Sequence, residues 1–513
     1  MRVSTLSLFL FTLQVLSAQA QPTPAERWQA DIDFLQRELP KHHPDFYRYY
    51  PQQNFETDLA TLRNNLDGKT DLQFALELQS IVAKAGDAHT LLDLTPLLQH
   101  HPVIPIGFGW YADGLYVSAT VKKFAPALGK RVLEINGLKP ETALEKIARF
   151  FARENDEAPL KDGPQWLRFP EANRIAGVSQ TDTLALLVVD DKGQRYFLKV
   201  HPLDFQKDRT GAQPATFAPK SPDLRWNPIK QVFSLNWLAQ DSIVYLQYNA
   251  CMGREMMLAD GDSLSASQLP PFQPIADSLF RLLDRYPGAR FFFDLRFNYG
   301  GNPADGIALA EKIASLAFVN LPHRVYVATN RYSDGAAVEI AATFSKITNA
   351  TLIGETPAQR PNYFSDLQSF YLPNSRVQVF HTTRPVDVLP GNPDKIRIDR
   401  PVELPFSDFR DGRDPVLDFV RGKRYAVYFI AFTMATKSSA LREAPPISPP
   451  STSGWRNRSG AFCALQEPPY RMEASSATSL PYFLASSTRI AACISWACSV
   501  LAVRPVPIAQ MGS

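Results

Sequence analysis

Two residues of this 513-residue chain carry the side chains of nucleophilic catalysis, and both lie where loops would present them. Ser333 belongs to the segment Asn330-Arg331-Tyr332-Ser333-Asp334-Gly335, between a buried strand pattern and a helix pattern. Its hydroxyl would lie beside the N–H groups of a helix N-terminus, which suits a nucleophile. His89 follows Gly86-Asp87 at the end of a helix pattern. Each has a simpler interpretation, because serine is a common N-cap and a histidine at a helix C-terminus interacts with the helix dipole.

A glycine turn could complete such a site. The apolar run that begins at Phe291 has no polar alternation, which predicts a strand buried on both faces of a parallel sheet. Gly300-Gly301 follows and would let backbone N–H groups approach a ligand closely. A helix pattern then starts at Pro303. Ligands of open α/β sheets lie beyond the carboxyl ends of such strands, although a plain strand-to-helix turn is the alternative.

The sequence favours neither a metal nor a cofactor. His42-His43 and His100-His101 are adjacent pairs whose side chains would point to different sides of an element, and each pair precedes a proline. No phosphate-loop pattern occurs, and the cysteines at 463, 493 and 498 lack the spacing of a zinc site. We therefore expect no metal and no cofactor.

Three regions with different periodicity would position these residues. From 22 to 85, apolar residues recur at helical spacing, and Thr23 with Glu26 forms a capping box. From 103 to about 201, short strand patterns surround one helix and predict a small β-rich module. From 242 onward, strands and helices alternate, which predicts βαβ units and a mostly parallel sheet. Strands near 368–372 and 376–381 are expected to extend that sheet in the antiparallel sense.

Length and charge bound the remaining possibilities. The chain is long enough for two or three domains. With 54 Lys and Arg against 51 Asp and Glu there is no basic stripe, so nucleic acid is not the expected partner. Residues 1–20 combine Arg2, an apolar run and Ala18-Gln19-Ala20, which predicts a secretory signal peptide. We therefore expect a secreted or periplasmic protein with no membrane span after signal removal.

The segments have the following expected boundaries. They are a signal peptide (1–20), a helical region (21–90), a β-rich module (103–204), a linker (205–234), an α/β core (235–423) and a disordered tail rich in Ser, Pro and Ala (424–513).

Taken in order, several motifs resemble the tail-specific (C-terminal processing) serine peptidase family. The resemblance covers roughly residues 25 to 422, and some of its motifs look like those of small secreted bacterial members. The motifs are Gly86-Asp87-Ala88-His89-Thr90, the turn from Asp294 to Asn302, Ile353-Gly354-Glu355-Thr356, Arg360-Pro361-Asn362-Tyr363, Leu372-Pro373-Asn374-Ser375 and Gly412-Arg413-Asp414-Pro415-Val416-Leu417.

The resemblance implies an α/β core related to the crotonase-like fold and a module similar to a permuted PDZ domain. It implies hydrolysis of a peptide or protein substrate by a serine on the loop after the third core strand. His89 would be the general base, oriented by Asp87, Glu355 or Asp366. The Gly300-Gly301 turn and the N–H of Asp334 would hold the oxyanion. Arg360 falls near the lysine position of the serine-lysine branch and cannot serve as a base, which favours the histidine arrangement.

The chain departs from the family pattern at the nucleophile. The serine usually lies roughly nineteen residues before the glycine of Ile-Gly-Glu, and that count from Gly354 leads to Gly335, two residues beyond Ser333. Two functions follow. In one, the loop is shifted and Ser333 acts as the nucleophile of a peptidase. In the other, the nucleophile is lost and the core binds peptides or an apolar ligand.

Overall fold

The computed structural model describes residues 23–205, 207, 214–217, 219–220, 231–259 and 261–422. The expected signal peptide, the tail and most of the expected linker lie outside the described residues. None of the described helices is long and apolar enough to cross a membrane.

Three helices open the described chain: α1 (Pro24–His42), α2 (Gln52–Arg63) and α3 (Asp71–Val82). The capping box is present, since Glu26 N–H donates to Thr23 Oγ1 (3.2 Å) and the Glu26 carboxylate accepts from Thr23 N–H (2.7 Å). Trp28, Ile32 and Leu35 form the buried stripe of α1. The helices predicted from the apolar spacing are therefore confirmed.

The middle region is an antiparallel sheet of order β2-β3-β4-β5-β6, with β7 (Pro214–Thr216) paired to β3. Its strands are β2 (Ile106–Tyr111), β3 (Gly114–Val121), β4 (Arg131–Ile135), β5 (Leu184–Val189) and β6 (Arg195–Val200). The sequence pattern predicts one helix here, but the described chain has α5 (Pro140–Ile147), α6 (Ala158–Trp166) and α7 (Pro170–Ile175). The additional helices are short, and Gly163-Pro164 inside α6 masks its helical signal.

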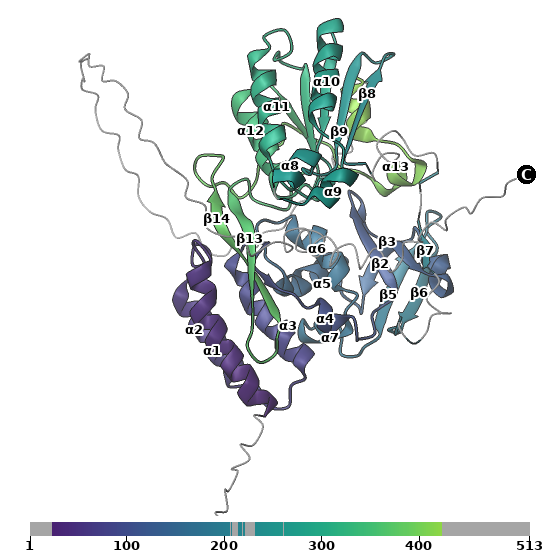
Figure 1. The fold of residues 1–513 in the computed structure, drawn as a ribbon. Helices are drawn as coiled ribbons and strands as arrows, with labels where there is room; N and C mark the ends of the chain where they lie inside the picture. Colours follow the sequence, from purple (N-terminus) through teal and green to yellow (C-terminus); the bar gives the residue numbers. More distant parts are fainter. Residues whose placement is uncertain are drawn as a thin grey trace, which may run out of the picture.

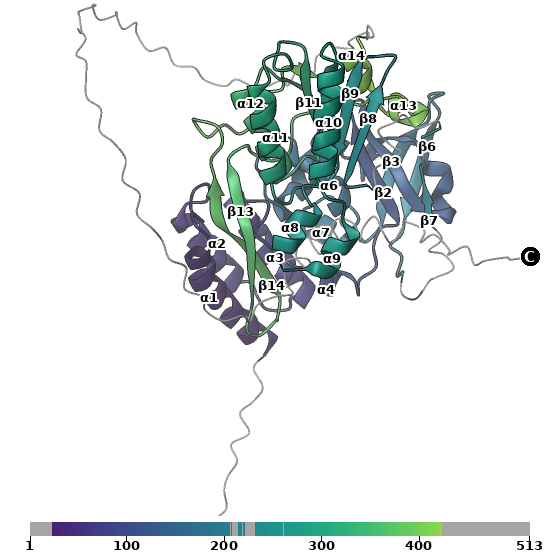
Figure 2. The same ribbon diagram turned by 45° about the horizontal axis from the view of Figure 1, so that its top comes forward.

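The core is a six-stranded sheet of order β15-β12-β11-β10-β9-β8. Five of its strands are parallel: β9 (Ile243–Tyr248), β10 (Arg290–Asp294), β11 (Val325–Thr329), β12 (Thr351–Gly354) and β15 (Arg400–Pro401). The sixth strand, β8 (Phe233–Leu238), is antiparallel to β9. Helices α10 (Gln273–Arg285), α11 (Ala304–Ser315) and α12 (Ala336–Ile347) lie together on one face (Figures 1 and 2), while α14 (Pro415–Val420) packs on the other. The predicted parallel sheet is therefore confirmed.

The last long strands correct one expectation. Strands β13 (Tyr363–Tyr371) and β14 (Gln378–Val386) do not extend the core sheet but form a separate sheet with β1 (Leu91–Leu92). The buried carboxylate of Asp31 in α1 accepts from the N–H groups of Asn374 (2.8 Å) and Ser375 (2.7 Å), which holds the hairpin turn on the helical region. This hairpin lies beside α1 and α3 in Figure 1 and packs a late part of the chain against the helical region.

Candidate active site

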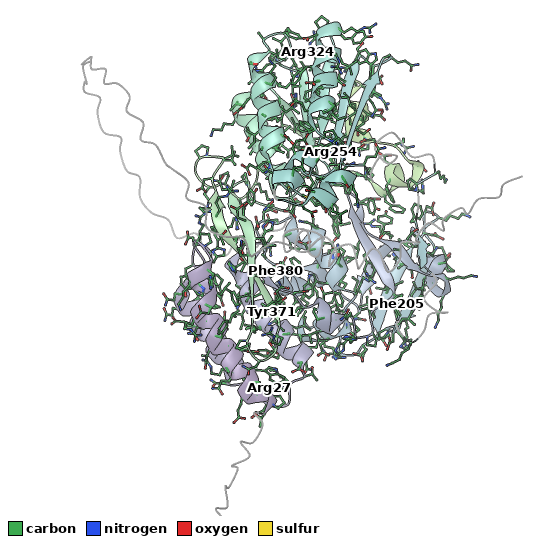
Figure 3. The ribbon with its side chains drawn as sticks, viewed as in Figure 1. Arg27, Phe205, Arg254, Arg324, Tyr371 and Phe380 are labelled. Carbon is green, nitrogen blue, oxygen red and sulfur yellow. The ribbon has the colours of Figure 1, made fainter. Side chains whose placement is uncertain are left out.

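A cavity of about 800 Å³ lies where the helical region, the middle module and the core meet. His89 and the residues of β1 line one side, and Phe151, Lys161 and Trp166 of the middle module line another. The core contributes the turns that contain Gly301 and Gly335. Phe380 of β14 and Phe205, both labelled in Figure 3, also line the cavity. The structure thus brings the three loops singled out from the sequence to a single cavity.

The Asp87 carboxylate lies next to the His89 ring. The two side chains approach to 3.6 Å between His89 Nδ1 and Asp87 Oδ1, and the backbone N–H of His89 donates to the same oxygen (3.0 Å). The other carboxylate oxygen accepts from the hydroxyls of Thr90 (2.6 Å) and Thr382 (2.9 Å) and lies 3.2 Å from His43 Nε2. These contacts hold a buried carboxylate behind the imidazole.

The other two acids considered for this role are engaged elsewhere. Glu355 lies against Arg331, with 3.3 Å between Arg331 Nε and Glu355 Oε2. Asp366 pairs with Arg384 at 2.7 Å. Of the three, Asp87 alone has a described contact with the His89 ring.

The charge on His89 follows from this partner. Burial disfavours the imidazolium, but the Asp87 carboxylate outweighs burial and raises the pKa of His89 to about 9. Burial likewise opposes the charge on Asp87, yet its contact with His43 and the nearby charge of His89 hold its pKa well below the usual range. At neutral pH His89 is therefore a cation and a poor proton acceptor.

Gly335 lies at the cavity in a conformation that few other residues adopt. It is the N-cap of α12, with φ 53° and ψ −122°, and it lines the cavity beside Ala336. A sharp, strained turn between strand and helix is also how a nucleophilic serine is presented in hydrolases. A Cβ atom added to Gly335 would meet only the Gly300 Cα within 4 Å, at 3.6 Å, so that the position has room for a side chain.

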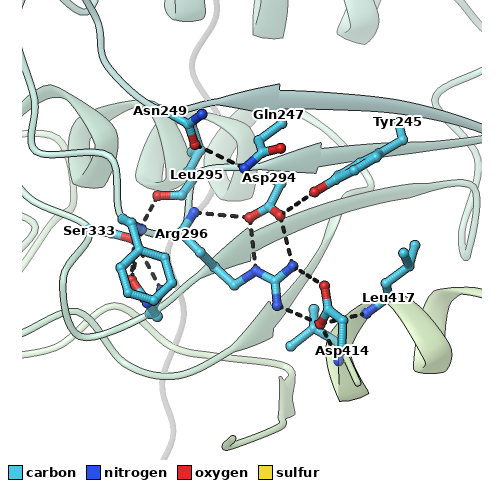
Figure 4. Close-up of polar contacts among 12 residues, drawn as sticks. Tyr245, Gln247, Asn249, Asp294, Leu295, Arg296, Ser333, Asp414 and Leu417 are labelled. Carbon is cyan, nitrogen blue, oxygen red and sulfur yellow. Dashed lines mark hydrogen bonds and ion pairs between the residues drawn. The ribbon is translucent and has the colours of Figure 1, made fainter. Parts of the chain in front are cut away.

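Ser333 faces the protein interior. Its side chain is fully buried, and its Oγ donates to the carbonyl of Leu295 (2.9 Å) and accepts from Asn330 N–H (3.0 Å). Figure 4 shows the bond to Leu295 at the end of β10. Ser333 is not among the residues that line the cavity. In this arrangement its hydroxyl fastens the turn to the sheet.

The N–H groups expected to hold an oxyanion differ in their partners. Gly300 N–H donates to Asn298 Oδ1 and Asp334 N–H donates to the Asn298 carbonyl, each at 2.9 Å. Gly301 lines the cavity with φ 127°, and its N–H has no acceptor in the described part of the chain. Only Gly301 thus presents a free N–H, because Asn298 uses the other two to hold the turns together.

Several charged groups of the site give no signal in the sequence. Lys161 Nζ donates to Asp334 Oδ2 (2.5 Å), and this pair lies directly beside Gly335. Glu154 accepts from the N–H groups of Ala88 (2.9 Å) and Arg360 (2.8 Å). Burial and the nearby Asp87 charge raise the pKa of Glu154 to about 7. Neither Lys161, in α6, nor Glu154, in the segment before α6, belongs to a motif, since tertiary packing brings each to its partners.

The charged clusters do not form a metal site: among the described residues, no group of His, Cys, Asp and Glu side chains has the arrangement of metal ligands.

Comparison with known proteins supports the fold. The sequence matches no known family and no curated protein. The solved structure of mature CPAF complexed with lactacystin is similar, with a TM-score of 0.51 and 10% identity over 77% of this chain and 98% of that chain. A mutant of CPAF gives a TM-score of 0.51 and 10% identity over 79% and 99%. The photosystem II D1 C-terminal processing protease, at 12% identity over 75% and 98%, has a TM-score of 0.33, too low to support an argument. The chain thus has the fold of the tail-specific serine peptidases.

Proposed function

We propose that this protein binds an extended peptide in the cavity of a serine peptidase fold without cleaving it. The observation that carries the proposal is the turn before α12, where Gly335 faces the cavity and the Ser333 hydroxyl is buried against Leu295. Removal of a serine nucleophile costs on the order of a million-fold in turnover. A glycine at this place therefore implies binding rather than slow hydrolysis.

The remaining groups suit a peptide ligand. Apolar and aromatic side chains form much of the cavity wall, and many polar or charged side chains line the rest, among them His89, Lys161 and Asp162. Such a mixed wall can take both the apolar side chains and the polar backbone of a peptide. The free Gly301 N–H can donate to a peptide carbonyl. The His89 imidazolium, which Asp87 stabilises, can donate a further, charge-assisted hydrogen bond to the peptide.

A fluorophosphonate probe combined with a peptide library tests this proposal. We expect no covalent labelling of the purified protein, and we expect library peptides to be retained and recovered intact. Gly301→Ala should reduce retention, because its Cβ would approach the Cys251 carbonyl oxygen to 2.2 Å and displace the turn. Glu141→Gln, on an exposed surface position of α5, is the control. Cleaved peptides, or labelling of the wild type, would overturn the proposal.

Hydrolysis through Ser333 is the second candidate. It is favoured by the retained contact between His89 and Asp87, and by the position of Ser333 two residues from Gly335 in the same turn. The turn would have to release the Leu295 carbonyl and rotate the hydroxyl toward the cavity. In that case the probe labels the wild type and Ser333→Ala abolishes labelling.

The cellular location is also a proposal. We propose that the protein acts outside the cytoplasm, on the strength of the signal-peptide pattern in residues 1–20. Cell fractionation tests this, and retention of the full-length chain in the cytoplasm would contradict it. We also propose that the core is related to the crotonase-like fold and that the β2–β6 sheet is related to a PDZ-like domain.

A further inference from the structure

A second, smaller cavity of about 170 Å³ lies at the carboxyl ends of the core strands. It is bounded by residues that follow β10, β11, β12 and β15, and β2 of the middle module covers it with Trp110 and Tyr111. It shares no lining residue with the His89 cavity. The carboxyl edge of a parallel sheet is the general place for ligands in such folds, and the proposed peptide site does not use this part of it.

The walls of this second cavity are rich in aromatic rings. Phe297 and Tyr332 stack with their ring centroids 5.5 Å apart and their planes within 10°. Tyr111 and Phe409 are 5.2 Å apart, and Trp110 adds an indole ring. Rings on several sides of one small space attract a cation through their negative faces.

The charged groups in and next to the wall of this cavity are paired with one another. Three guanidinium groups lie in or next to its wall, and each is matched by two carboxylates. The pairs are Arg296 with Asp294 and Asp414, Arg331 with Glu157 and Glu355, and Arg413 with Asp408 and Asp411. Asp411 also pairs with Arg410, which in turn pairs with Asp191. Among the lining residues themselves the charges balance, with Arg296 and Arg413 against Glu355 and Asp414.

Glu355 is the carboxylate of the cavity wall that is least engaged. Its contacts to Arg331 Nε (3.3 Å), Arg331 N–H (3.4 Å) and Leu404 N–H (3.4 Å) are all longer than a typical hydrogen bond. After burial, the Glu355 charge is among the causes that raise the pKa of Glu403 and of Glu157. The carboxylate thus retains the capacity to pair with a further cation.

From the aromatic walls and the loosely held Glu355, we propose that this cavity binds an alkylammonium group. The group would lie against the aromatic rings with its charge next to Glu355. It could belong to a free quaternary amine or to a lysine side chain, which share this chemistry. The inference is independent of peptide binding at the His89 cavity.

Isothermal titration of the purified protein tests the proposal at constant ionic strength. The ligands are choline, Nα-acetyl-lysine amide and 3,3-dimethyl-1-butanol, which has the shape of choline without its charge. We expect at least one of the two ammonium compounds to bind about tenfold or more tightly than the neutral alcohol, since a desolvated cation–π contact is worth about 2 kcal/mol. Preference between choline and the lysine derivative identifies the source of the group.

Variants assign the binding to this cavity. Glu355→Gln keeps the shape and removes the charge, and Trp110→Leu removes a ring; both should weaken binding of the ammonium compound about tenfold or more. Glu141→Gln removes an exposed carboxylate outside the cavity and should leave binding unchanged. Thermal unfolding identifies any variant that does not fold, and the wild-type comparison with the neutral alcohol needs no variant. The proposal would be overturned if neither ammonium compound binds, or if neither binds more tightly than the neutral alcohol.

Discussion

Replacement of Gly335 by serine should convert the cavity into a hydrolytic site. The added Cβ meets only the Gly300 Cα at 3.6 Å, an ordinary contact, so that the side chain fits without displacing the turn. A residue other than glycine in this conformation (φ 53°, ψ −122°) costs about 1–3 kcal/mol of stability. The new hydroxyl would enter the cavity that already contains His89 and the free Gly301 N–H.

The pKa of His89 sets the size of the expected gain. With a pKa of about 9, about 1% of the imidazole is neutral at pH 7 and about half at pH 9. A serine nucleophile increases the turnover rate on the order of a million-fold when its base is neutral. With about 1% of His89 neutral, the rate of the variant should rise about ten-thousand-fold over wild type at pH 7. Its activity should then rise about fifty-fold between pH 7 and pH 9, as His89 loses its proton.

The assay is the rate of fluorophosphonate labelling at pH 7 and pH 9, with cleavage of peptides that the wild type retains. Gly335→Ala carries the same backbone strain without the hydroxyl and should not be labelled. Adding His89→Ala to Gly335→Ser should abolish the gain. A folded Gly335→Ser protein that is not labelled at pH 9, or labelling that does not depend on His89, would refute the geometry on which the reasoning depends.

Three further predictions concern charge and stability. Asp87→Asn removes the carboxylate that contributes most to raising the pKa of His89 and leaves burial, so the NMR titration of His89 should move to a pKa below 9, and an unchanged pKa would contradict the assignment. The pKa of His89 is higher in the folded than in the unfolded protein, so protonated His89 stabilises the folded state below pH 6.5, and this contribution is lost as the pH rises through 9. Between pH 6.5 and pH 9 the free energy of unfolding should therefore fall by more in wild type than in His89→Gln. Arg296→Met leaves the buried Asp294 and Asp414 carboxylates (Figure 4) without their shared partner and should cost about 3–5 kcal/mol in urea unfolding; a loss below about 1 kcal/mol would show that the network contributes little.

The buried network around Arg296 explains why the sheet edge keeps its shape. Arg296 donates to both oxygens of Asp294 and to both oxygens of Asp414, at 2.7–2.8 Å, and Tyr245 Oη donates to Asp294 Oδ2 (2.8 Å). These bonds join β9, β10 and the start of α14 (Figure 4). The turn toward Gly300 and Gly301 therefore begins from a fixed point.

Local sequence by itself determined much of the fold. The capping box at Thr23, the apolar stripe of α1 and the unbroken apolar run at Phe291 act between neighbouring residues, so that their patterns are readable without tertiary contacts. The motifs around His89 and Gly300 likewise identified the loops that meet at the cavity. The position of β13 and β14 could not be predicted from the sequence, because it depends on a buried carboxylate in α1, more than 300 residues away in the chain.

Tertiary structure alone decided which side chains face the cavity. Ser333 and Gly335 are two residues apart in one turn, and the sequence cannot show which of them points inward. That choice follows from the Leu295 carbonyl and the Asn330 N–H, which accept from and donate to the Ser333 hydroxyl in the interior. The charge of His89 was also undecided, since it depends on a buried Asp87 that is held by Thr90 of the same loop and by Thr382 of the distant strand β14. Packing between distant segments sets both the direction of the Ser333 side chain and the charge of His89, so a local sequence pattern cannot predict either.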